Sequence, residues 1–130
     1  MLCKNEIIKI VSDMNLPSDK YWITAGAGLV IHGVKEFTND IDIGVTTDLA
    51  DYLVCNGYKF NRVDDGTRII KINENLEALE NWFVEEIISA DGLPVASLES
   101  IKKQKIELGR EKDIKDINMI EKYIENKGVF

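Results

Sequence analysis

The most constraining stretch of this 130-residue chain is the run Asp-Ile-Asp-Ile-Gly-Val at residues 40–45. Its polar and apolar residues alternate, which is the period-two pattern of a β-strand with one polar face and one buried face. On such a strand Asp40 and Asp42 project to the same side, roughly 6–7 Å apart along the chain. Two carboxylates on one face repel each other. The pattern therefore indicates either a solvent-exposed edge strand or a site where a divalent cation relieves the repulsion.

The remaining sequence predicts helices and further strands around this run. Helical apolar spacing or capping residues predict helices at residues 5–14, 26–33, 48–56 (with Asp48 as N-cap), from Ser97 to an interruption at Gly109, and at 112–127. Strands are predicted at residues 21–25, 58–63, 68–73 and 82–89, whereas 75–80 fits either state. We expect one domain over residues 1–130, with an α/β (α+β) fold in which helices flank a mixed β-sheet and two C-terminal helices close the chain.

Two features of these last helices concern their packing. Leu98, Ile101, Lys105 and Leu108 share one face, so Lys105 lies in an otherwise apolar stripe. On the following helix we expect the inward side chains to be Ile114, Ile117, Ile120 and Ile124.

Charge and cysteine content restrict the class of protein. The net charge is −7, divided into −8 for residues 1–96 and +1 for residues 97–130. The acidic part argues against a broad nucleic-acid-binding surface and suits either a carboxylate-lined metal site or a plain acidic surface. No apolar run approaches the roughly 20 residues of a membrane span, and the first residues do not form a signal peptide. We expect a cytoplasmic protein with reduced Cys3 and Cys55, the latter packed in the core.

A run of small residues precedes the acidic strand. Thr24-Ala25-Gly26-Ala27-Gly28 follows a predicted strand and opens a predicted helix. Small residues at this point allow phosphate oxygens to approach the backbone N–H groups at the start of a helix. They would equally allow a helix to pack closely on the sheet.

Two sequence blocks together resemble a known family. Ala25-Gly26-Ala27-Gly28-Leu29-Val30-Ile31-His32-Gly33 and Thr38-Asn39-Asp40-Ile41-Asp42-Ile43 are similar to the signature of nucleotidyltransferase-fold proteins. These include minimal nucleotidyltransferases, antibiotic-modifying nucleotidyltransferases and toxins of abortive-infection systems. The C-terminal part also resembles the family, at Lys105, Gly109, Arg110, Lys112, Asp113 and Asp116. The resemblance covers residues 21–120 and implies the nucleotidyltransferase fold.

The resemblance implies roles for the matched residues. Ala25, Gly26 and Thr38 would bind the nucleotide, Asp40 and Asp42 would hold Mg²⁺, and Lys105 and Arg110 would face the phosphates. A third carboxylate on a later strand completes such sites, as a metal ligand and often as a base. Glu85 and Glu86 are the candidates; only one of them can face inward, and Glu85 is favoured. Lys105 has the alternative of lying along apolar surface with its amine in water.

Other conspicuous residues are expected to be structural. Lys112, Asp113 and Asp116 would connect the last two helices through charge pairs. His32 would belong to a helix packed on the sheet, and Trp22 and Trp82 to the core.

The implied activity is a Mg²⁺-dependent transfer of a nucleoside monophosphate from a nucleoside triphosphate, preferably ATP, to a hydroxyl of a small molecule, RNA or protein. The chain offers no separate acceptor domain, so a partner protein or a second copy would supply that surface. Two departures from the family pattern, Ala25 in place of Gly and Glu36 in place of Arg, favour an alternative. This is a non-catalytic domain that binds a nucleotide or a partner protein, as in toxin–antitoxin pairs.

Overall fold

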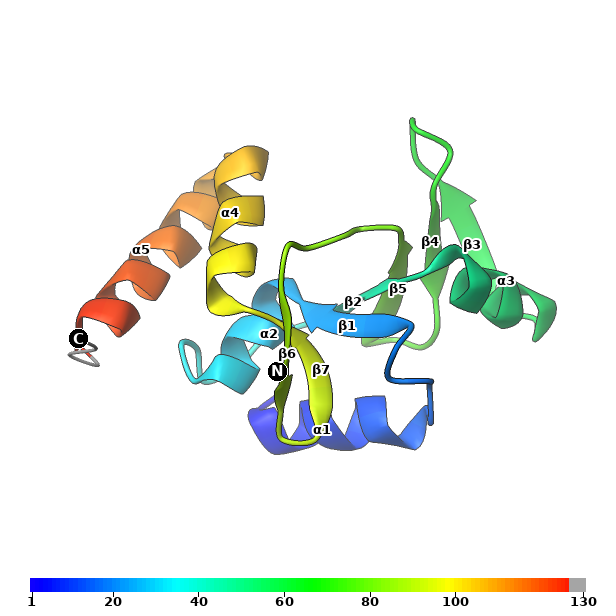
Figure 1. Ribbon diagram of the computed structural model, residues 1–130, viewed down its shortest axis with the longest axis horizontal. Helices are drawn as coiled ribbons and strands as arrows, with labels where there is room; N and C mark the ends of the chain where they lie inside the picture. Colours follow the sequence, from blue (N-terminus) through cyan, green and yellow to red (C-terminus); the bar gives the residue numbers. More distant parts are fainter. Residues whose placement is uncertain (127–130) are drawn as a thin grey trace.

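A computed structural model, which describes residues 1–126, contains a seven-stranded sheet and five helices in that part of the chain (Figure 1). In chain order the elements are α1 (Lys4–Asp13), β1 (Tyr21–Thr24), α2 (Ala25–His32), β2 (Ile41–Val45), α3 (Thr47–Cys55), β3 (Lys59–Arg62), β4 (Arg68–Lys71), β5 (Leu76–Glu80), β6 (Ile87–Ala90), β7 (Leu93–Ala96), α4 (Leu98–Leu108) and α5 (Glu111–Asn126). The expected mixed sheet with flanking helices and two final helices is confirmed. The predicted helix end at Lys127 lies outside the described residues.

The sheet has the strand order β3-β4-β5-β2-β1-β7-β6, with β2 in the middle. β2 pairs with β5 in parallel and with β1 in antiparallel orientation, and β1 pairs with β7 in parallel. The outer pairs β3–β4, β4–β5 and β6–β7 are antiparallel. In this register Asp42 lies opposite Thr24 on one side and Glu77 on the other.

One face of the sheet carries the main core. Ile41, Ile43 and Val45 of β2 are fully buried on this face. Helices α1 and α3 pack there through buried side chains that include Ile7, Val11, Leu49 and Leu53. Each such aliphatic side chain stabilises the fold by about 1.5–3 kcal/mol on full burial. The alternation of β2 therefore leaves Asp42 on the opposite face, as its sequence predicts.

That opposite face is shaped by a close aromatic contact. The Trp22 indole lies over Gly44, where an added Cβ would be 2.1 Å from the ring. Trp22 also stacks on Phe83 with ring centroids 5.7 Å apart, and its Nε1–H donates to the Trp82 carbonyl at 3.0 Å. Trp22 is thus a core residue, as expected.

Helices α4 and α5 form a smaller packing unit with α2. Leu29, Ala96, Ile101 and Ile120 make up its buried cluster. Gly28 allows this contact, because a Cβ there would lie 2.7 Å from Ile101 Cδ1. The prediction that Ile114 points inward is wrong, since its side chain is 54% exposed. The first turn of α5 faces charged residues of α4 instead of the apolar cluster, so the fully buried residue there is Asp113.

Other differences from the expected elements have local causes. Helix α3 begins after Thr46, whose Oγ1 accepts from the Leu49 N–H, so Thr46 and not Asp48 is the N-cap. Cys55 is exposed, because Leu53 lies on the buried face of α3 and a residue two positions later points away from it.

Within residues 1–126, no helix combines the length and apolarity needed to cross a bilayer.

Candidate active site

A cavity of about 540 Å³ opens on the face of the sheet that carries Asp42. Elements α2, β2, β5, α4 and α5 all contribute to its wall. Of the residues that the sequence indicated for a site, those lining it are Ala25, Gly26, Thr38, Asp40, Asp42, Lys105 and Arg110. Side chains far apart in the sequence thus surround one space.

Three carboxylates meet in this cavity. Asp40 directly precedes β2, Asp42 lies within it, and Glu77 of β5 is the register neighbour of Asp42. Burial raises the pKa of Asp42 to about 6, and the negative charges of Glu77 and Asp40 act in the same direction. Lys112 and Lys105 oppose this rise in the pKa of Asp42. The site therefore concentrates more negative charge than its cations neutralise.

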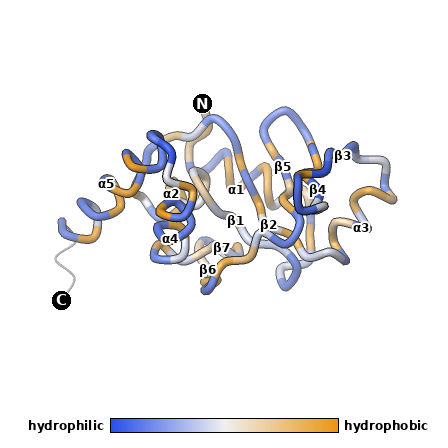
Figure 2. The backbone as a smooth tube through the Cα atoms, turned by 90° about the horizontal axis from the view of Figure 1, so that it is seen from above, coloured by the Kyte–Doolittle hydropathy of each residue, from blue (hydrophilic) through white to orange (hydrophobic). Residues whose placement is uncertain are grey.

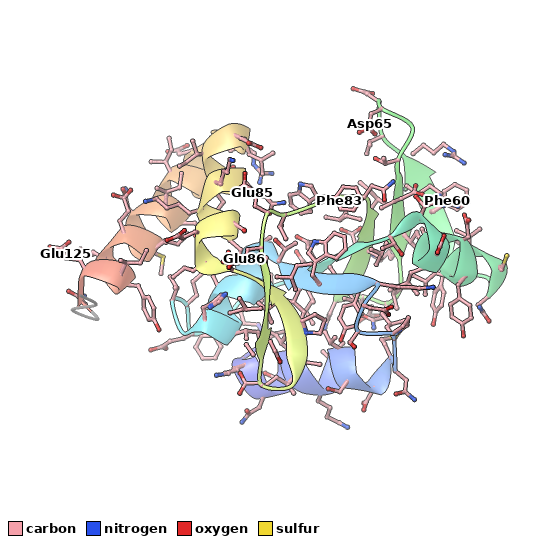
Figure 3. All side chains as sticks on the ribbon, viewed as in Figure 1. Phe60, Asp65, Phe83, Glu85, Glu86 and Glu125 are labelled. Carbon is pink, nitrogen blue, oxygen red and sulfur yellow. The ribbon has the colours of Figure 1, made fainter. Side chains whose placement is uncertain are left out.

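Glu77, and not Glu85, accompanies the aspartate pair. The expected strand at 82–89 is wrong over its first half, because only Ile87–Ala90 is strand. Figure 3 shows Glu85 and Glu86 on the segment that leads to β6, beside α4. Glu85 is outside the cavity and forms an ion pair with Lys103. The placement of Glu85 on the face of Asp40 and Asp42 is therefore a wrong prediction.

The segment around Glu85 is held by α4 instead of by a neighbouring strand. The Glu86 N–H donates to Ser100 Oγ at 3.0 Å, and the Glu86 carbonyl accepts from the Ser97 N–H at 2.9 Å. Gln104 reaches the Phe83 carbonyl at 3.2 Å. These bonds satisfy the backbone without a strand.

The carboxylates fit a magnesium ion that is bound together with a substrate. Among residues 1–126, no three His, Cys, Asp or Glu side chains are close enough to enclose a metal ion by themselves. Mg²⁺ does not need such a cage, because it commonly binds one or two carboxylates, several waters and substrate phosphates. Asp40 and Asp42 provide this open set of oxygen donors, and their mutual repulsion is what a cation would relieve.

The turn between β1 and α2 brings backbone N–H groups to the cavity. Ala25 has φ +54°, a left-handed conformation that disfavours a residue with a Cβ. Gly26 follows, and a Cβ there would lie 2.8 Å from Thr38 Oγ1. The tight approach of Thr38 thus requires glycine at 26. The Ala25 and Gly26 N–H groups are at the start of α2, where helices bind anions.

Thr38 is fixed from two directions. Its N–H donates to the Leu2 carbonyl at 3.0 Å, and the Leu2 N–H donates to the Thr38 carbonyl at 2.7 Å. Its Oγ1 donates to the Asp40 carbonyl at 3.3 Å. These bonds hold the segment that carries Asp40 beside the turn at Gly26.

Both of the expected phosphate-binding cations, Lys105 and Arg110, already have carboxylate partners. Lys105 is buried and pairs with Asp116 at 2.9 Å and with Asp113 at 3.5 Å. Arg110 binds Asp113 through Nε at 2.5 Å and Nη2 at 3.1 Å. These hydrogen bonds raise the pKa of Arg110 and lower the pKa of Asp113. Asp113 and Asp116 thus connect the last two helices, as predicted, but through Lys105, and Lys112 takes no part in these ion pairs within residues 1–126.

Lys112 differs from these cations. It lines the cavity and is exposed, and within residues 1–126 it has no ion pair. Its positive charge lowers the pKa of Asp42, against the raising effect of burial. The sequence match at 110–113 identified this position but suggested a purely structural role. Glu36, the acidic departure from the family pattern, is exposed and outside the cavity wall.

Of the residues expected to be structural, His32 packs on the sheet and Trp82 lines the cavity. His32 Nε2 lies 2.8 Å from the Ala96 carbonyl, which connects α2 to β7 and fits the expected structural role. Trp82 is half-buried and lines the cavity, so it is not confined to the core.

Comparison with known proteins identifies the fold. No protein-family model and no curated protein matches the sequence. Among the matching solved structures is the aminoglycoside nucleotidyltransferase ANT(2″)-Ia in complex with adenylyl-2″-tobramycin. The TM-score is 0.57 at 16% sequence identity, and the alignment covers 92% of this chain and 86% of that one. The chain therefore has the nucleotidyltransferase fold, without assignment to a particular family within it.

Proposed function

We propose that this protein is a Mg²⁺-dependent nucleotidyltransferase that moves a nucleoside monophosphate, preferably from ATP, to a hydroxyl of an acceptor molecule. The observation that carries the proposal is the convergence of Asp40, Asp42 and Glu77 beside the turn at Gly26. Carboxylates for a cation and backbone donors for phosphates are the two components that phosphoryl transfer requires. We place the protein in the cytoplasm as part of this proposal.

Each cavity residue has a task in the proposed reaction. The N–H groups of Ala25 and Gly26 bind phosphate oxygens at the start of α2. Asp40 and Asp42 would hold the magnesium ion, which would neutralise charge on the phosphates. Lys112 adds a positive charge close to Asp42. Lys105 and Arg110 act as positioning residues, because their partners Asp116 and Asp113 fix α5 against α4.

The bond changes follow from this arrangement. The acceptor oxygen forms a bond to the α-phosphorus of the triphosphate. The bond from that phosphorus to the bridging oxygen breaks, and its electron pair leaves with pyrophosphate. The hydroxyl proton passes to Glu77, which lies beside Asp42 in the sheet.

A second candidate function is a nucleotide- or partner-binding domain without catalysis. This candidate is supported by the ion pairs that Lys105 and Arg110 form with carboxylates, because they leave fewer cations available to bind a triphosphate. The strained Ala25 at the turn favours the same alternative. In this case the domain would act through a partner protein or a second copy.

The two candidates are tested by calorimetric titration of nucleoside triphosphates with and without Mg²⁺. The enzyme proposal expects binding of ATP that needs Mg²⁺ and is lost in Asp42→Ala. The matched control is Asp19→Asn, an exposed aspartate outside the cavity, which should bind as the unmodified protein does. Absence of binding under every condition would contradict both nucleotide-dependent functions and leave partner binding.

A further inference from the structure

A second hollow lies next to the cavity on the same face of the sheet. It measures about 570 Å³ and is lined by Tyr58, Lys59, Phe60, Asn61, Ile69, Lys71 and Glu77. Glu77 lines both this hollow and the cavity that holds Asp40 and Asp42. The two spaces therefore meet at the carboxylate to which we assign the proton transfer.

The sheet register places a row of charged side chains from one space to the other. Asp42 is opposite Glu77, Glu77 is opposite Lys71, and Lys71 is opposite Lys59. Directly opposed residues share a face with Cβ atoms about 5 Å apart. Lys71 is thus the immediate neighbour of Glu77, and Lys59 is one strand further from it. Phe60, labelled in Figure 3, alternates to the other face, where Ile70 is buried.

Neither lysine has an ion pair within residues 1–126, and Glu77, opposite Lys71, is the nearest carboxylate in the sheet register. Both lysine side chains are exposed. Like charges directly opposite each other destabilise a sheet. An anion bound between Lys59 and Lys71 would relieve the repulsion between these two lysines.

Lys59 and Lys71 carry the positive charge on this face of the hairpin, in a chain with net charge −7. The other two basic residues of the hairpin, Arg62 and Arg68, lie over the Phe60 ring on the opposite face, and Arg68 is paired there with carboxylates. Figure 2, which colours hydropathy and not charge, shows hydrophilic stretches along the β3–β4 hairpin. The two lysines give this face of the hairpin a local positive charge that attracts an anionic group.

The positions of the turn and of Glu77 indicate what the hollow receives. The turn at Gly26 follows β1, on one side of Asp42, and Glu77 of β5 is on the other side. In phosphoryl transfer the attacking and leaving oxygens are roughly in line. If the leaving pyrophosphate is at the turn, the attacking hydroxyl arrives from the side of β5, and the rest of the acceptor extends over β4 and β3.

We propose that this hollow binds the acceptor, that the acceptor carries a phosphate group as well as its reactive hydroxyl, and that Lys59 and Lys71 bind this phosphate. The inference rests on the proposed function and narrows its acceptor class. The bond changes stay those given above: the hydroxyl oxygen of the acceptor bonds to the α-phosphorus, pyrophosphate leaves with the electron pair, and Glu77 takes the proton. The phosphate of the acceptor is not altered.

The test is a titration of the full chain with ribose 5-phosphate, followed by amide chemical shifts in NMR spectra. Ribose without the phosphate and a polycationic aminoglycoside serve as comparison ligands. We expect ribose 5-phosphate to shift residues of β3, β4 and β5, and neither comparison ligand to do so. The double variant Lys59→Gln/Lys71→Gln should weaken binding about tenfold. Lys122→Gln, an exposed lysine on α5, is the matched control and should leave the affinity unchanged.

Two results overturn the proposal. One is that neither the wild type nor the lysine variant binds ribose 5-phosphate, or that both bind it with the same affinity. The other is loss of magnesium-dependent ATP binding in the lysine variant, because the lysines would then serve the nucleotide. A wild-type protein that binds ribose 5-phosphate through the lysines but never binds ATP disproves the proposed transfer while supporting the phosphate site.

A short RNA with a free 3′ hydroxyl separates two sources of the acceptor phosphate. Tighter binding of the RNA than of ribose 5-phosphate, with the same loss in the lysine variant, supports a polynucleotide end. Equal or weaker binding of the RNA supports a small phosphorylated molecule.

Discussion

Ala25 is the residue at which the backbone of the site is most strained. Its φ of +54° is accessible to glycine but costs a residue with a Cβ roughly 1–2 kcal/mol. The family pattern has glycine where this chain has alanine. The turn thus keeps its shape in spite of the side chain, because Thr38 and the packing of α2 hold it.

We expect Ala25→Gly to raise the free energy of unfolding by about 1 kcal/mol, because the strain disappears. Ala27→Gly is the control: Ala27 is buried within the same helix, and the change should lower the free energy of unfolding by about 1 kcal/mol. Urea denaturation of both variants measures the two effects. If both variants changed the free energy of unfolding in the same direction, the backbone of Ala25 would not be strained.

Glu77 and Glu85 give the sharpest contrast between single residues of the proposed site. Glu77→Gln removes the proton acceptor and should slow pyrophosphate release from ATP by about a hundredfold. Glu85→Gln removes an exposed partner of Lys103 and should leave the rate unchanged. The two rates are measured under identical Mg²⁺ and ATP concentrations. A large effect of Glu85→Gln with none of Glu77→Gln would show that Glu85, and not Glu77, is the third carboxylate.

Among the elements, β5 explains why Glu77 could not be identified from the sequence. Leu76-Glu77-Ala78-Leu79-Glu80 consists of good helix formers, so local propensity conflicts with a strand. Its place beside β2 in the middle of the sheet decides the outcome, because Leu76 and Ala78 become fully buried there. Asp40 and Asp42 were predictable because alternation in β2 is a local signal. The partner of Asp42 depends on strand order, which a single sequence does not contain.

A largely buried ion pair on the core side of the sheet stabilises the pairing of β4 with β5. Arg68 binds Glu80 through Nε at 3.0 Å and Nη2 at 2.8 Å, and both side chains are at most 10% exposed. The hydrogen bonds from Arg68 lower the pKa of Glu80 from 4.5 to about 2. Because the pKa is lower in the folded state, the ionised Glu80 stabilises the protein at pH values above its pKa in the unfolded chain. This contribution disappears as the pH falls toward 2.

Glu80→Gln should therefore lower the free energy of unfolding at pH 7 by about 3 kcal/mol. The difference between the variant and the unmodified protein should shrink between pH 4.5 and pH 2, as Glu80 becomes protonated. Urea denaturation at pH 7, 5 and 3 measures it. A difference that stays constant over this range would show that the charge of Glu80 contributes nothing.

The contact of α4 with α5 depends on a buried charge. Lys105 is only 8% exposed in its side chain and binds two carboxylates, so Lys105→Met should destabilise the protein by about 3 kcal/mol. Lys103→Met removes a lysine of the same helix whose side chain is 55% exposed, and should cost less than about 1 kcal/mol. Thermal or urea unfolding distinguishes them. Similar losses for both variants would contradict a special role of the buried pair.

At the scale of the whole molecule, the sheet separates stability from chemistry. The face covered by α1 and α3 holds the larger core, and the opposite face holds the carboxylates and both hollows. Hydrophobic periodicity predicted this layering and most element positions. It did not identify Lys105 as the partner of Asp113 and Asp116, because those contacts arise only when α5 folds back on α4.

In the proposed enzyme, Asp40 and Asp42 hold a metal ion between a nucleotide at Gly26 and the base Glu77. The most direct measurement is a crystal structure with Mn²⁺ in place of Mg²⁺ and an ATP analogue whose α–β bridge is a methylene group. We predict an anomalous peak from Mn²⁺ between Asp40 and Asp42, with the analogue's phosphates at the start of α2. A nucleotide bound elsewhere, or bound here with the metal away from both aspartates, would contradict this arrangement of the site.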